Sequence, residues 1–207
     1  VQVSLPRVFG VFFNQTHAPA LADLSARQAL DAAIDKNALV ASVLNGYGSV
    51  LNGPIPPSLL SNSSPARPQS FKTILAQRTA TTTSATSYTD KARAILQNGG
   101  WTYNTTTGLW TKKKLVLSFT LATADSPELV ATANAVAENW RTLGVKVVVQ
   151  IYPISELNTS VIRPRAYDAI LFGEVVGRDL DLFAGVRPRR TFVGVPSRYP
   201  RVDLVVI

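Results

Sequence analysis

The sequence contains no cysteine, no methionine and a single histidine, His17. The absence of cysteine excludes disulfide bonds and thiol catalysis, and together with the lone histidine it excludes the usual zinc sites. No apolar run reaches about 18 residues, so no membrane-spanning helix is predicted. The chain also lacks a G-x-S-x-G nucleophile motif and a G-x-x-x-x-G-K-[ST] phosphate-binding loop. We therefore expect no catalytic residue, no metal site, no cofactor and no enzymatic activity.

Negatively charged residues are also scarce. The chain carries 21 Lys and Arg against 13 Asp and Glu, which gives a formal net charge of +8. Such a balance allows a basic nucleic-acid-binding domain as an alternative function. The arginines, however, crowd the segment 185–207 without the interleaved aromatic residues that stack on bases. Solvated loops are the favoured interpretation, and we expect no nucleic-acid partner.

What is present is typical of a folded α/β protein. Hydrophobic residues make up 46% of the 207 residues and charged residues 16%, a globular rather than a disordered profile. This length suits one large domain or two small ones. No signal peptide opens the chain at Val1, so we expect that a signal was removed or that the chain is a fragment.

A βαβ unit is predicted between Leu115 and Ile151. Residues from Leu115 to Ala122 alternate in the period of a strand, and Ser126 with Pro127 marks the start of a helix. The helix should end at Gly144, because glycine adopts the left-handed cap without strain. Its inner face should comprise Leu129, Ala133, Val136, Trp140 and Leu143. Val145 to Ile151 is almost entirely apolar, which predicts a second, parallel strand covered on both faces.

Other elements should bury their apolar faces against this unit. Strands are expected at Val8–Asn14 and Tyr167–Phe172, and a hairpin between Trp101 and Trp110 whose two tryptophans pack on the sheet. Helices are expected from Ala26, with Ser25 and Gln28 at capping-box spacing, after Asp35, after Thr89-Asp90, and over Ser155–Ile162. The fold class is thus α/β: a mixed sheet with a βαβ unit and flanking helices.

Three stretches are predicted to be irregular. Residues 61–87 are rich in Ser, Thr and Pro and read as a long loop or linker within an α/β lobe at 1–184. Residues 185–207 form an atypical arginine-rich C-terminal segment. Gly173 to Asp181 should be a loop at the carboxyl end of the third strand, the end of an α/β sheet where ligands collect. His17 is expected to lie on the surface, in a loop, with no obvious partner.

Several motifs, in a specific order, resemble the extracellular solute-binding proteins of ABC importers for dipeptides, oligopeptides and nickel. Trp140 to Val145 resembles the family's "W-x-x-L-G-I". The other matching segments are Arg27 to Asp35 ("R-Q-A-L-x-x-A-I-D"), Gly46 to Pro57 ("G-P-I-P"), Tyr88 to Trp101 ("Y-D-x-x-K-A-K-x-L-L-x-x-A-G-W"), Tyr167 to Leu171 ("Y-D-A-x-L") and Asp179 to Asp181 ("D-P-D"). Leu180 departs from the family's usual Pro, and the family's aromatic and polar segment is absent from 185–199.

This resemblance implies the second lobe of a class II periplasmic-binding-protein-like fold, with the first lobe missing from the chain. It implies a substrate-binding component that takes up peptides or similar small solutes, with ABC transporter permease subunits as partners. The expected location is periplasmic or extracellular, and compatible with a lipid anchor on the full-length protein. The candidate ligand-binding residues are Gly173, Glu174, Val175, Arg178, Asp179 and Asp181, with Asn52 and Pro54 as weaker candidates. A hydrolase that uses Glu174 with Asp179 or Asp181 as a carboxylate pair is the enzymatic alternative.

Overall fold

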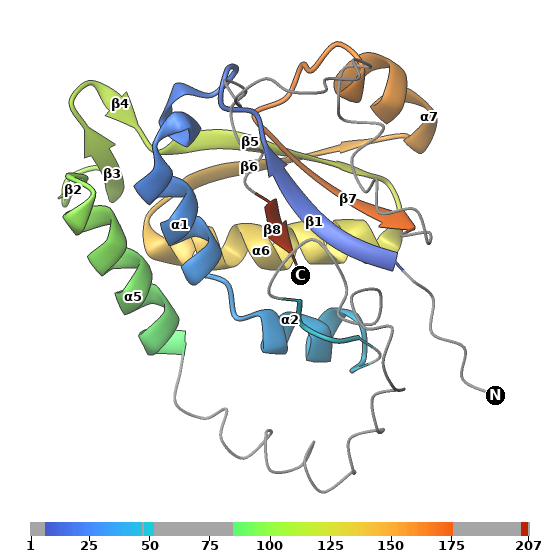
Figure 1. The fold of residues 1–207 in the computed structure, drawn as a ribbon, viewed down its shortest axis with the longest axis horizontal. Helices are drawn as coiled ribbons and strands as arrows, with labels where there is room; N and C mark the ends of the chain where they lie inside the picture. The colour runs from blue at the N-terminus through green and yellow to red at the C-terminus, as the bar shows by residue number, and fades with distance from the viewer. Residues whose placement is uncertain (1–6, 47, 52–84, 176–203, 207) are drawn as a thin grey trace, which may run out of the picture.

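A five-stranded mixed sheet forms the body of the protein (Figure 1). The computed structural model describes residues 7–46, 48–51, 85–175 and 204–206. The strand order is β6-β5-β7-β1-β8, in which β5 is parallel to β6 and β7, and β1 is antiparallel to β7 and β8. The strands are β1 (Arg7–Phe13), β5 (Ser118–Ala124), β6 (Lys146–Tyr152), β7 (Ala169–Val175) and β8 (Leu204–Val206). The mixed α/β fold predicted from the sequence is confirmed.

Helices and a small second sheet flank this body. The second sheet has the order β2-β3-β4, and α1 and α5 lie side by side next to it (Figure 1). The strands are β2 (Thr102–Asn104), β3 (Leu109–Lys112) and β4 (Leu115–Val116). The helices are η1 (Pro19–Ala22), α1 (Leu24–Ala32), α2 (Lys36–Val43), α5 (Ala85–Asn98), α6 (Pro127–Leu143) and α7 (Ile154–Glu156), which leads into the π-helical turn Leu157–Ile162.

The predicted βαβ unit is β5-α6-β6, and its helix is confirmed at both ends. Pro127 occupies the first turn of α6, and Gly144 closes the helix with φ of 99°. The predicted inner face, Leu129, Ala133, Val136, Trp140 and Leu143, is buried throughout. One detail differs from the sequence prediction: Ser126 occupies the cap position, but its hydroxyl makes no capping hydrogen bond. Proline geometry and the glycine cap are therefore sufficient to set the limits of this helix.

Tryptophan side chains join the elements. Trp140 of α6 lies against Phe13 and Phe119, and its Nε1 donates to the Leu30 carbonyl at 2.8 Å. Trp110 of β3 donates in the same way to the Leu143 carbonyl at 2.8 Å. Each indole satisfies one of the last four carbonyls of a helix, which have no partner within the helix itself. Trp101 and Trp110 of the hairpin were predicted to pack on the sheet, and both are buried in the hydrophobic core.

Two strand predictions are wrong in part. The strand expected from Leu115 is split at Leu117: β4 turns back onto β3, and only the residues from Ser118 enter the main sheet. The strand β6 is not covered on both faces, since Val148 is 48% and Ile151 51% exposed, and among the described strands it pairs with β5 alone. An apolar run indicates a strand but does not reveal whether a neighbour lies beside it.

Two helix starts also differ from the sequence prediction. Asp23, not Ser25, caps α1, because its carboxylate accepts from the backbone N–H groups of Ser25 and Ala26. Helix α5 begins at Ala85, before the predicted cap at Thr89-Asp90. The loop or linker predicted at 61–87 is described only at its last three residues, which form the start of α5. The predicted cap at Asp35 is confirmed, with its side chain accepting from the Ala38 N–H at 2.9 Å.

Candidate functional site

The first three residues of the predicted ligand-binding loop belong to a strand. Gly173, Glu174 and Val175 continue β7 as a strand, paired with Phe9, Val8 and Arg7 of β1. The predicted strand end at Phe172 is therefore wrong, because β1 offers backbone partners for three further residues. These three lie at the carboxyl end of β7. The other candidates, Asn52, Pro54, Arg178, Asp179 and Asp181, lie outside the described residues.

Three parallel strands end at one edge of the sheet, which we call the carboxyl edge. It comprises Ala124 at the end of β5 with Asp125 directly after it, Tyr152 at the end of β6, and Gly173–Val175 at the end of β7. The Asp125 N–H donates to the Tyr152 carbonyl at 3.0 Å, which holds the ends of β5 and β6 together. Helices α6 and α7 both start just beyond this point. In α/β sheets this is the edge at which ligands bind.

Side chains of two kinds are exposed at the carboxyl edge. Ile151 is 51% and Ile154 70% exposed, although both are large and apolar. Asp125, Glu128 and Glu156 are exposed carboxylates of the same edge. The Tyr152 hydroxyl donates to Gln150 Oε1 at 3.0 Å on β6. Sequence reasoning missed these residues because it placed the β6 segment inside the sheet. The signal that was present is Asp125 directly after the β5 segment and Glu156 two residues after Ile154.

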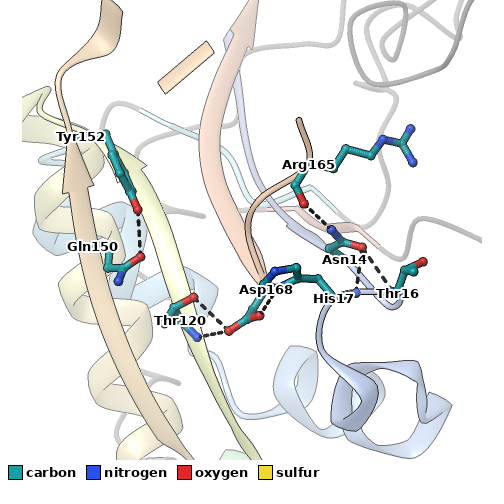
Figure 2. Close-up of polar contacts among 8 residues, drawn as sticks. All are labelled: Asn14, Thr16, His17, Thr120, Gln150, Tyr152, Arg165 and Asp168. Carbon is teal, nitrogen blue, oxygen red and sulfur yellow. Dashed lines mark hydrogen bonds and ion pairs between the residues drawn. The ribbon is translucent and has the colours of Figure 1, made fainter. Parts of the chain in front are cut away.

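A polar cluster lies at the opposite end of the strands (Figure 2). The Asp168 carboxylate accepts from the Thr120 N–H at 2.8 Å and from the Thr120 hydroxyl at 2.9 Å, and lies 2.7 Å from His17 Nδ1. His17 is exposed as predicted, but the prediction that it has no partner is wrong. The cluster joins the segment after β1 to the starts of β5 and β7, so it holds the sheet together rather than facing the carboxyl edge.

Asn14 extends this cluster along the same end of the sheet (Figure 2). Its Nδ2 donates to the Arg165 carbonyl at 3.0 Å, while its Oδ1 accepts from the N–H groups of Thr16 and His17 at 3.2 and 3.3 Å. An asparagine that accepts from the backbone two and three residues ahead stabilises a local turn. The turn directs the His17 imidazole toward Asp168.

The charge state of Asp168 follows from these contacts. Burial of the carboxyl raises its pKa, but the hydrogen bonds from Thr120 and His17 and the proximity of the imidazole outweigh burial, so the pKa of Asp168 lies below its ordinary value. A depressed pKa means that the ionised form stabilises the folded state above the unfolded-state value of about 3.9. That stability is lost as the pH falls through the folded-state pKa.

Asp168→Asn is expected to lower the free energy of unfolding by about 1–2 kcal/mol at pH 6, because the amide loses the charge and one acceptor. The difference from the unsubstituted protein should be constant above about pH 5 and should shrink as the pH falls below about 4. Urea denaturation between pH 3 and pH 7 measures it, with exposed Asp90→Asn as the matched control. A difference that does not change with pH would contradict the proposed role of the ionised carboxylate.

The pKa of Asp23 is also lowered, and its carboxylate contacts the hairpin. Burial raises its pKa, but hydrogen bonds from Lys112, Ser25 and the Ala26 N–H lower the pKa of Asp23 to about 2. Lys112 lies in β3 and forms an ion pair with the same carboxylate. The cap of α1 is thereby tied to the β3–β4 turn.

Within the described ranges, no group of three His, Asp or Glu side chains is arranged to hold a metal ion. No helix in those ranges is both long enough and apolar enough to span a bilayer.

The fold has the mixed sheet and flanking helices of class II periplasmic-binding-protein-like proteins, with the strand ends gathered at one edge. The chain belongs to the bacterial extracellular solute-binding proteins, family 5, whose middle-region model matches residues 2–181. The resemblance seen in the sequence motifs is confirmed. A comparison with curated proteins finds no match.

Solved structures with a similar fold are also solute-binding proteins. The chain is similar to the oligopeptide-binding protein AppA of Bacillus subtilis, in complex with a nonapeptide, at 25% identity and a TM-score of 0.69. It is also similar to NikZ of Campylobacter jejuni in complex with Ni(L-His), at 22% identity and a TM-score of 0.64. Each alignment covers 88% of this chain, against 34% of AppA and 32% of NikZ. The chain thus spans about a third of the length of these proteins.

Proposed function

We propose that this chain is part of the substrate-binding component of an ABC importer and that it binds peptides or similar small solutes. The match to the solute-binding family over residues 2–181 carries the proposal. The similarity to AppA, whose structure contains a nonapeptide, supports peptides over other solutes. The carboxyl edge supports it further, because the ends of β5, β6 and β7 lie together there and Asp125, Ile151 and Ile154 are exposed beside them.

The mechanism is capture without chemistry. The carboxyl edge forms one wall of the site, and another part of the complete protein forms the facing wall. The two parts close over the ligand by hinge motion, and the liganded form docks on the permease subunits of the importer. Gly173, Glu174 and Val175 contribute to the wall from β7. The segments with Arg178, Asp179 and Asp181, and with Asn52 and Pro54, are proposed to contribute as well.

The location follows from the same proposal. Members of this family are extracellular solute-binding proteins, so we place this protein in the periplasm or outside the cell. A lipid anchor on the complete protein would keep it near the permease. Ligand exchange needs no cofactor and no catalytic group, because the bound solute leaves unchanged.

Native mass spectrometry and titration calorimetry of the complete polypeptide that contains these residues test the proposal. A panel of free peptides of two to nine residues should include members that bind one to one with dissociation constants in the micromolar range or tighter, about −8 kcal/mol. Denaturing extraction should release a small solute of unchanged mass. No binding across peptides, sugars and metal chelates would refute the proposal. So would turnover of a glycoside that is lost in Glu174→Gln, which supports the hydrolase.

A further inference from the structure

Two large apolar side chains are exposed at the carboxyl edge. Ile151 and Ile154 are three residues apart across Pro153, so their Cα atoms lie within about 11 Å of each other. Ile154 is 70% exposed, more than any other large apolar residue among those described. A fully buried isoleucine gains about 1.5–3 kcal/mol over an exposed one, so this pair has apolar area available for a ligand.

Carboxylates flank the apolar pair. The strand register sets Thr123 opposite Ile151, which brings Asp125, two residues further on, next to Pro153. The hydrogen bond from the Asp125 N–H to Tyr152 fixes this position. Glu156 follows Ile154 by two residues, in the short helix α7. Both carboxylates are exposed, and neither forms an ion pair with another residue of the described ranges.

We infer that Ile151 and Ile154, with Asp125 and Glu156 beside them, bind an aliphatic side chain and an adjacent positive group of the ligand. The inference rests on the proposed function, and it specifies the solute as a cationic peptide that carries an aliphatic residue. Charge complementarity selects the cationic group, because the described charged side chains after β5 and β6 at this edge are all acidic. The apolar pair selects the aliphatic neighbour.

The position of the pair favours a ligand over a bare strand surface. Val148 is 48% exposed on the same strand, but it lies on the other face of the sheet and four residues before the strand ends. Single exposed apolar residues of that kind are ordinary on protein surfaces. Ile151 and Ile154 differ, because they occur together and at the edge where strand ends form ligand sites. Val148 is therefore a matched control on the same strand.

Titration calorimetry of the complete polypeptide with Lys-Leu-Lys, Lys-Gly-Lys and Glu-Leu-Glu tests the inference. Lys-Leu-Lys should bind about tenfold or more tightly than Lys-Gly-Lys, since loss of one buried aliphatic side chain costs about that factor. It should also bind more tightly than Glu-Leu-Glu, whose carboxylates are repelled by Asp125 and Glu156. Ile154→Ser should weaken Lys-Leu-Lys about tenfold and leave Lys-Gly-Lys unchanged. The double substitution Asp125→Asn with Glu156→Gln should reduce the preference for Lys-Leu-Lys over Glu-Leu-Glu. Val148→Ser should change none of the three affinities.

The outcomes separate the inference from the proposed function. Equal affinity for Lys-Leu-Lys and Lys-Gly-Lys, or equal effects of Ile154→Ser and Val148→Ser, overturns the inference while peptide binding stands. A preference for Glu-Leu-Glu also overturns it. If no peptide of these three or of the wider panel binds, both the inference and the proposed function are wrong. Salt should weaken Lys-Leu-Lys more than a neutral peptide, as expected of exposed carboxylates.

Discussion

Trp140→Ala is expected to lower the free energy of unfolding by about 3–5 kcal/mol, the range for removing a large aromatic side chain from a packed core. Trp140 is fully buried, and its ring lies against Phe119 with the ring centroids 5.4 Å apart. The substitution also removes the hydrogen bond to the Leu30 carbonyl. One side chain thus connects α6 to the sheet and to the end of α1. Urea denaturation followed by circular dichroism measures the loss.

Two controls separate packing from hydrogen bonding. Trp140→Phe keeps most of the aromatic packing but lacks the N–H. It should therefore lower the free energy of unfolding clearly less than Trp140→Ala does. Tyr103→Ala removes an aromatic ring that is 47% exposed and should cost less than either. A loss below about 1 kcal/mol for Trp140→Ala would show that the surrounding core is not packed as described.

Gly99→Ala is expected to lower the free energy of unfolding by about 2–3 kcal/mol through overpacking. A Cβ atom at Gly99 would lie 2.0 Å from Ser25 Oγ and 2.3 Å from Ser25 Cβ. The glycine is required here by the close approach of α5 to α1, and not by its backbone conformation. The substitution should separate the two helices, which would also disturb the Asp23 cap that Ser25 supports.

A double-mutant cycle with Ser25→Gly tests this explanation. In the Ser25→Gly background the clashing atoms are gone, so Gly99→Ala should cost less than about 1 kcal/mol. Gly100→Ala is the matched control: its Cβ would meet only Lys112 Cε, at 3.8 Å, but its φ of 80° makes the backbone strained. Its cost should therefore be unaffected by Ser25→Gly. Equal costs of Gly99→Ala in both backgrounds would rule out the steric explanation.

The elements predicted best are those whose signals are local. Helix α6 was predicted from Pro127 to Gly144 with its buried face, because proline, glycine and a spacing of three and four residues act within one helix. The parallel pairing of β5 with β6 followed, since a strand, helix and strand with short links allow few other arrangements. Family motifs along the chain added the fold and the class of protein, which periodicity alone does not give.

Elements that depend on distant neighbours were predicted less well. The β6 segment reads as a buried strand, but the order of the sheet leaves it at the edge. Ser25 has the spacing of a helix cap, but Asp23 takes that role, supported by Lys112 from 89 residues away. Both Asp23 and Ser25 are residue types that cap helices. The contact with Lys112 from β3 favours Asp23 as the cap.

The candidate site shows the same division. The sequence predicts site residues at the carboxyl end of β7, and this stays a prediction; Ile151, Ile154 and Asp125 were not among the candidates. Their proposed role depends on β5 and β6 ending together and on β6 having no further strand beside it within the described part of the sheet. His17 gave no signal of its partner, because Asp168 is 151 residues away in the sequence.

The sequence by itself determined that β1, β5, β6 and β7 are strands, the limits of α6, the buried face around Trp140 and the solute-binding family, because propensity, capping and motifs act over short stretches of chain. Only the tertiary structure decided which strand forms the edge, which carboxylate caps α1, and which side chains stay exposed where the strands end. These three features depend on contacts between segments far apart in the chain. A local residue pattern does not indicate which distant segment packs beside it.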